Sequence, residues 1–180
     1  MGKNLIQQAR GKGGPRYRAP SFRWEGESKY ARHDGTTLSG KIIGLIHCQG
    51  HSAPLAEILY NNGNKVLLQA PEGVRIGDIV EMGDSIEVKK GNIMPLKNIP
   101  EGIEIFNIES FPGDGGKFVR TSGGFAKIIT KMQNRIVVEM PSAKRREFLP
   151  DCRATIGIIA GSGRKEKPYL KAGTRYFAMK

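Results

Sequence analysis

Short apolar runs separated by turn residues fill most of this chain of 180 residues. In the first half they read LSGKIIGLIH from Leu38, APLAEILY from Ala53 and KVLLQA from Lys65, with the turn NNGN between the last two. Asn-Gly between two apolar runs is a strong β-hairpin signal. No stretch of ten residues repeats its apolar positions with the period of a helix. The pattern therefore predicts an all-β fold.

The apolar runs form two series. The first continues through PEGVRIGDIVEMGD and SIEVKKG, each of which predicts a strand, and NIMPLKNIPEG then predicts a link with one turn of helix. The second series predicts five strands, in IEIFNIES, FAKIITKM, IVVEM, KRREF and ATIGIIAG. Strands spaced by about 8–12 residues favour small barrels over βαβ units. We expect one barrel over residues 38–90 and a second over 91–160, between terminal segments 1–37 and 161–180.

Positive charge is concentrated at the two ends of the chain. The formal net charge is +12, and residues 1–34 and 161–180 account for +10 of it. These ends hold only five of the 43 Leu, Ile, Val and Phe residues, so they cannot bury themselves. One interpretation is a pair of solvated, disordered tails. The other is a pair of arms that become ordered on a polyanion.

The aromatic residues favour the second interpretation. Seven of the 13 Phe, Tyr and Trp residues lie in the two ends, among the cations. Aromatic rings mixed with Arg and Lys suit RNA, because unpaired bases stack on such planes while cations meet phosphates. The candidate RNA-binding cations of the arms are Lys3, Arg10, Lys12, Arg16, Arg18, Arg23, Arg164, Lys165, Lys167, Lys171 and Arg175.

A glycine-rich stretch, FPGDGGKFVRTSGGFAK from Phe111, joins two predicted strands of the second barrel. Its spacing matches neither the Walker phosphate loop nor the dinucleotide fingerprint. The remaining interpretations are a flexible hairpin loop without a ligand and a loop tip that meets nucleic-acid phosphates. In the second, the backbone N–H groups of Gly115 and Gly116 and the side chains of Lys117 and Arg120 bind phosphate oxygens.

Candidate catalytic and metal sites are sparse. His47, Cys48 and His51 lie close together, but zinc needs about four ligands and no further residues have the spacing. All three histidines precede residue 52, which makes a catalytic triad hard to build, and the carboxylates are scattered. We therefore expect no enzymatic activity, no cofactor and no metal.

The sequence also bears on location. No apolar run approaches the roughly 18 residues of a membrane span, and no signal-peptide pattern stands at the N-terminus. The two cysteines form no C-x-x-C pair, and we expect them to be reduced and buried. These features predict a cytoplasmic protein without a membrane partner.

Eight collinear stretches cover nearly all of the chain: QQARGKGGPRYRAPS, SAPLA, APEGVRIGD, GNIMPLKNIPEG, FPGDGGKFVRTSGGFAKI, MPSAKRREF, CRATIG and AGSGRKEKPYLKAG. The glycine loop, PLKNIPEG and CRATIG are the most specific of them. In these stretches the sequence resembles the family of the universal second protein of the large ribosomal subunit, in its archaeal and eukaryotic form.

The resemblance implies an oligonucleotide-binding-type barrel followed by an SH3-like barrel, flanked by extended basic arms. It implies a structural constituent of the large ribosomal subunit, found on the cytoplasmic ribosome. The expected partners are large-subunit ribosomal RNA, neighbouring ribosomal proteins and, at the subunit interface, small-subunit RNA. The expected role includes support of subunit association and of the peptidyl-transferase region, without a catalytic group.

The motif match also assigns residues. Lys117 and Arg120 are expected to contact RNA, and so are His51 and Ser52 in the HSA stretch. The family usually has Arg at the position of His51, so a phosphate contact there requires a protonated or stacking imidazole. The family normally continues past Lys180 into a tail rich in Gly, His and Arg, and none of the functions of that tail is carried over.

Two other functions are compatible with the same residues. A free translation factor or RNA chaperone built from the same barrels would also need cationic arms. An enzyme acting on nucleic acid would show turnover that depends on a divalent metal. Permanent residence in large subunits, measured by sedimentation, separates the ribosomal protein from the free factor.

We predict that Arg120→Ala and deletion of residues 1–23 each weaken RNA binding without unfolding the barrels, because each removes cations outside the predicted core. Filter binding to a ribosomal RNA fragment at moderate salt measures the affinity, and circular dichroism reports the folding. Unchanged affinity would contradict the assignment of the loop and the arm.

Overall fold

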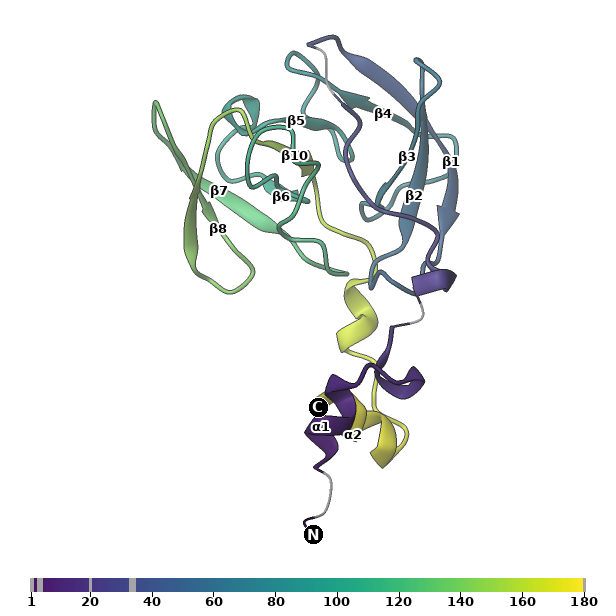
Figure 1. Ribbon diagram of the computed structural model, residues 1–180. Helices are drawn as coiled ribbons and strands as arrows, with labels where there is room; N and C mark the ends of the chain where they lie inside the picture. The colour runs from purple at the N-terminus through teal and green to yellow at the C-terminus, as the bar shows by residue number, and fades with distance from the viewer. Residues whose placement is uncertain (1, 3–4, 20, 33–34, 180) are drawn as a thin grey trace.

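In the described part of the chain, ten strands make up the body and two short helices lie in the terminal segments (Figure 1). The computed structural model describes residues 2, 5–19, 21–32 and 35–179. The strands are β1 (Leu38–Ile46), β2 (Leu55–Tyr60), β3 (Lys65–Gln69), β4 (Ile79–Met82), β5 (Ile93–Pro95), β6 (Glu104–Phe106), β7 (Ala126–Lys131), β8 (Ile136–Glu139), β9 (Arg145–Phe148) and β10 (Arg153–Ile156). The helices are α1 (Ile6–Gly11) and α2 (Ala172–Met179), with 3-10 turns η1 (Pro15–Tyr17), η2 (Ser21–Arg23), η3 (Leu96–Asn98) and η4 (Ser162–Lys165).

All ten strands follow one another in a single sheet, in the order β3-β2-β1-β4-β5-β10-β6-β7-β8-β9. The pairings are antiparallel except that of β4 with β5, which is parallel and consists of one residue pair, Met82 with Ile93. Register shifts within β1 and β7 mark bulges, which bend a strand and increase its twist. The sheet therefore curls into two small barrels that meet between β4 and β5, and an isolated bridge between Pro71 and Ile159 joins them at a second place.

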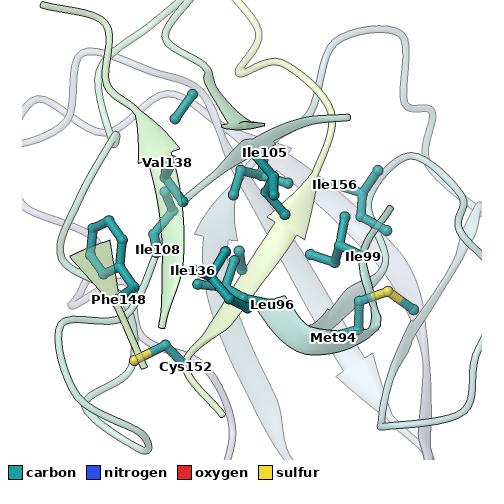
Figure 2. Close-up of a cluster of buried hydrophobic side chains, with 13 residues drawn as sticks. Met94, Leu96, Ile99, Ile105, Ile108, Ile136, Val138, Phe148, Cys152 and Ile156 are labelled. Carbon is teal, nitrogen blue, oxygen red and sulfur yellow. The ribbon is translucent and has the colours of Figure 1, made fainter. Parts of the chain in front are cut away.

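Each barrel has its own apolar core. The buried cluster of the first contains residues from Tyr30 to Ile93, and that of the second contains residues from Met94 to Ile156. In the second, side chains from β6, β8 and the segments around them converge on one another (Figure 2). Alternation along the strands explains this, since β8 buries every second residue more deeply than its neighbours. The prediction of an all-β fold of two small barrels is confirmed.

One predicted strand is wrong. Residues 85–91, SIEVKKG in the sequence, form no strand. The carbonyl oxygen of Glu87 accepts hydrogen bonds from the backbone N–H of Lys89 at 2.9 Å and from the side-chain amide of Asn92 at 3.0 Å. These local bonds use a backbone group that a strand would pair across a sheet. The strand forms instead at β5, inside the predicted link, and the predicted helical turn follows it as η3.

The terminal segments differ from the extended arms that the sequence predicts. Each contains a short helix, α1 of six residues and α2 of eight. No helix in the described ranges is both long and apolar enough to cross a membrane. Both segments extend below the barrels in Figure 1. Within the predicted arm 1–37, however, Ser28, Tyr30 and Ala31 are buried in the body.

A buried ion pair lies where the two barrels and this segment meet. Arg153 at the start of β10 donates to Glu109 Oε1 from Nη2 at 2.6 Å and from Nε at 3.1 Å. The other carboxylate oxygen accepts from the Arg153 backbone N–H at 2.9 Å. Nη1 donates to the carbonyl oxygen of Ala31 at 3.0 Å and lies 3.5 Å from Met82 Sδ on β4. One guanidinium therefore contacts both barrels and the N-terminal segment.

We predict that Glu109→Ala lowers the free energy of unfolding by about 3–5 kcal/mol, because it leaves a buried guanidinium without its counter-ion. The matched control is Glu147→Ala, which removes an exposed carboxylate paired with Arg135 on the surface. Exposed pairs contribute about 0–1 kcal/mol. Urea unfolding followed by circular dichroism measures both variants, and equal losses would contradict the central role of Glu109.

Candidate nucleic-acid interface

The glycine loop is an ordered structure that its own polar groups hold in place. Asp114 organises the tip: its Oδ2 accepts from the backbone N–H of Ser110 at 2.9 Å and of Phe111 at 3.3 Å, and its Oδ1 accepts from Gly116 N–H at 3.0 Å. Although burial raises the pKa of Asp114, these hydrogen bonds bring it below its ordinary value. The carboxylate therefore stays charged and holds the turn closed. Ile108 pairs with Phe118 across the base of the loop.

Gly115 and Gly116 have a different role from the one the sequence suggests. Both are buried, and their N–H groups already donate within the protein, Gly115 to Glu109 Oε1 at 3.1 Å and Gly116 to Asp114. A Cβ on Gly116 would stand 2.4 Å from Asn107 Oδ1. The geometry therefore gives no support to a phosphate contact by these two N–H groups, and their assignment to RNA stays a prediction. The glycines instead allow the loop to pack closely against the residues beneath it.

Lys117 has the geometry of a phosphate contact. Its side chain is 62% exposed, and Nζ lies 3.5 Å from Asp114 Oδ2, a distance at which the ammonium remains able to bind a second anion. Its backbone N–H donates to the carbonyl of Ile108 at 2.9 Å, so the base of the side chain is fixed while its end reaches solvent. The assignment of Lys117 to RNA stays a prediction.

The side chain of Arg120 points into the protein and not toward solvent. Its Nη2 donates to the carbonyl of Ser28 at 2.8 Å, and its Nη1 donates to that of Gly116 at 3.2 Å. The amide oxygen of Gln69, in the orientation that satisfies both of its atoms, accepts from Nε at 3.0 Å and from Nη2 at 3.1 Å. Most of the guanidinium donors are therefore occupied by the protein. A direct phosphate contact by Arg120 has no support from this geometry, and Arg120→Ala would also remove a donor from the carbonyls of Ser28 and Gly116 and from the amide oxygen of Gln69.

His51 and Ser52 lie beside the end of the glycine loop. Burial, followed by the nearby charge of Arg120, lowers the pKa of His51, so its imidazole is neutral at pH 7. Its Nδ1 lies 3.3 Å from Cys48 Sγ. Ser52 Oγ accepts from the backbone N–H of Ser122 at 3.2 Å and so links the two loops. A neutral ring does not replace the charge of the Arg usual in the family, so the RNA contact predicted for His51 is stacking on a base.

The predicted cations of the arms are exposed wherever their side chains are described. Two of them lie over aromatic rings, Arg10 at 5.7 Å from the centre of Tyr17 and Arg23 at 5.3 Å from that of Phe22. The exposed set is Arg10, Lys12, Arg18, Arg23, Arg164, Lys167, Lys171 and Arg175. Lys3 lies outside the described residues, as do the side chains of Arg16 and Lys165. Paired ring and guanidinium planes are suitable platforms for bases.

The aromatic residue Trp24 fixes the path of the N-terminal arm. A Cβ on Gly50 would stand 2.7 Å from the indole atom Cδ2, so Trp24 lies directly against this glycine. The indole is still 45% exposed. The arm is therefore docked beside the loop that contains His51, so these two regions predicted from the sequence lie near one another.

Sequence reasoning missed the polar residues that support the loop from below, above all Glu109 and Arg153. A signal for Glu109 was present: in IEIFNIES it falls at the same alternation as Ile105, an inward position. A charged residue in such a position is almost always paired. Which cation pairs with it depends on the fold, because Arg153 is 44 residues away in the sequence.

Taken together, the arrangement is typical of a nucleic-acid-binding scaffold protein: a body of balanced charge with cations on two arms and one loop tip. A family model described as "Ribosomal Proteins L2, C-terminal domain" matches residues 89–180. The chain is 51% identical to the large ribosomal subunit protein uL2 of Methanocaldococcus jannaschii, and the match covers 100% of this chain and 76% of that protein.

Two further relatives carry the same name. The uL2 protein of Methanosphaera stadtmanae is 49% identical, and that of Methanococcoides burtonii is 48% identical; each match covers 100% of this chain and 76% of the relative. The chain therefore belongs to the ribosomal protein L2 (uL2) family, and it is of the archaeal type.

We predict that Gly116→Ala destabilises the protein far more than Gly113→Ala. Both glycines have positive φ, +93° and +86°, which costs an L-residue about 1–2 kcal/mol. A methyl group at Gly113 meets open space, whereas one at Gly116 overlaps Asn107 and adds about 1–3 kcal/mol. Urea unfolding compares the two, and equal losses would show that the packing of Gly116 is not essential.

Proposed function

We propose that the chain is a structural constituent of the large ribosomal subunit and binds ribosomal RNA as part of the cytoplasmic ribosome. The observation that supports this most directly is that the excess positive charge lies in the arms, outside the two barrels that form the core. Residues 35–160 carry 15 Lys and Arg against 13 acids, while the exposed cations of the arms stand outside the barrels. The family membership supports the same conclusion, since the relatives are named as proteins of the large subunit.

The RNA contacts in this proposal belong to the two arms and to Lys117. The barrels hold these groups apart, and the arms supply both charge and stacking planes, with Arg10 on Tyr17 and Arg23 on Phe22. His51 and Ser52 contribute at most uncharged contacts. Arg120, Gly115 and Gly116 support the loop from within rather than meeting phosphates.

Finer parts of the proposal concern position and organisation. We infer that the protein supports subunit association and the peptidyl-transferase region, with small-subunit RNA and neighbouring ribosomal proteins as further partners. We also infer the division into segments 1–37, 38–90, 91–160 and 161–180, with an oligonucleotide-binding-type barrel before an SH3-like one. The two separate apolar cores, which divide between Ile93 and Met94, support two barrels, and the first core also takes Tyr30 and Ala31 from segment 1–37. The role is structural, and the lack of enzymatic activity stays a prediction.

Salt dependence tests the proposed RNA interface. If about ten cations meet phosphates, the logarithm of the affinity falls against the logarithm of salt concentration with a slope of roughly −7 to −9. Lys117→Ala should reduce the slope by about 1, because one phosphate contact is lost. The control is Lys65→Ala, whose ammonium lies 2.6 Å from Glu57 on the first barrel and should leave the slope unchanged. A slope near zero would contradict the proposal.

Sedimentation of a native extract tests residence on the ribosome. The proposal expects the chain to travel with large subunits and to stay there through a wash at moderate salt. A pool that remains at the top of the gradient would favour a free RNA-binding factor instead.

A further inference from the structure

A short segment of the N-terminal arm runs along the glycine loop and the edge of the first barrel. We call residues 26–31 the strap. Ser28 pairs with Leu67 of β3 as an isolated parallel bridge, and Gly26 approaches the same leucine side chain. Further along, the backbone N–H of Tyr30 donates to the carbonyl of Gly115 at 3.1 Å. The strap therefore contacts β3 on one side and the loop on the other.

The side chain of Tyr30 anchors the strap below the loop. Its hydroxyl donates to the carbonyl of Asn107 at 2.6 Å and lies 2.7 Å from Thr155 Oγ1 on β10. Its ring lies 5.3 Å from the guanidinium carbon of Arg153. Burial raises the pKa of Tyr30, so the hydroxyl keeps its proton and remains a donor. Asn107 is the first residue after β6, four residues before the glycine loop begins at Phe111.

Arg120 joins the strap to the other half of the loop. The guanidinium donates to Ser28 in the strap and to Gly116 at the loop tip, while Gln69 accepts from it at the end of β3. Lys29 packs its aliphatic stem over Gly115, where an added Cβ would stand 3.0 Å from Lys29 Cγ. The segment just before the loop, the loop tip and Arg120 are thus each tied to the strap.

We propose that docking of the strap sets the conformation of the glycine loop and thereby the position of Lys117. Tyr30 and Arg120 are positioning residues in this inference: they act on RNA binding through the loop and do not touch RNA themselves. The expected effect on RNA binding rests on the proposed function. The coupling between the strap and the loop is a property of the free protein and can be tested without RNA.

Hydrogen exchange of the full chain without RNA tests the coupling. Tyr30→Phe keeps the ring and removes the hydroxyl, and it should speed exchange of the loop amides of Gly115, Lys117 and Phe118 by about threefold to tenfold, the effect of one lost hydrogen bond. Amides of β2 and β8 should keep their wild-type rates. The matched control is Tyr60→Phe, because the buried hydroxyl of Tyr60 has no hydrogen-bond partner among the described residues. In this variant the loop amides should exchange at the wild-type rate.

Arg120→Lys provides a second, independent test with the charge preserved. A single ammonium cannot reach Ser28, Gly116 and Gln69 together, so the loop amides should again exchange faster while the barrels stay intact. Loop amides that exchange at the wild-type rate in both variants would overturn the proposal. So would an equal acceleration of all amides, because the effect would then come from global stability and not from the loop.

RNA affinity separates this inference from the proposed function. If both are correct, Lys117→Ala weakens binding without altering exchange, whereas Arg120→Lys weakens binding and speeds exchange of the loop at unchanged net charge. If Lys117→Ala leaves affinity unchanged while the exchange results hold, the loop is not an RNA contact but its coupling to the strap stands.

Discussion

The buried pair of Arg153 and Glu109 is the interaction on which the rest of the structure depends. In the described ranges the backbones of the two barrels are linked by one short strand pair, between β4 and β5, and by an isolated bridge between Pro71 and Ile159. Around Arg153, by contrast, β10, the residue Met82 of β4 and the carbonyl of Ala31 meet in the space of one guanidinium. The planar group, with several donors in a fixed geometry, specifies how these segments fit together.

Such a pair is not a simple source of stability. Removing two charges from water has a large desolvation penalty, and a buried ion pair is often no better than a well-packed apolar group of the same size. Here the remaining polar atoms are also satisfied, because Glu109 accepts from the backbone of Arg153 and of Gly115. The pair therefore acts chiefly by excluding other arrangements of these segments. It also fixes the glycine loop, because Glu109 accepts from the backbone N–H of Gly115.

The charge distribution follows from the same arrangement. The polar groups of the loop are used internally, so Lys117 extends from a rigid base, while the cations of the arms stay in solvent. A protein that is held in place by RNA needs a body that does not depend on RNA for its shape. This requirement is met because the polar groups of the body bind one another and the cations of the arms stay exposed. The strap is the part of the N-terminal arm that packs against the body.

Much of this could be predicted from the sequence, because it depends on local pattern. Alternating apolar residues and turn signals predicted the all-β fold, and the clustering of Lys and Arg at the two ends predicted that these cations stand exposed outside the barrels. The uses of Gly115, Gly116 and Arg120 were decided only by the tertiary structure. A glycine or an arginine in a loop has the same local signal whether it faces phosphate or protein, and the difference lies in partners such as Ser28, which is 92 residues from Arg120 in the chain. Local sequence specifies which groups can form hydrogen bonds, whereas the long-range folding of the chain decides which of them are already taken.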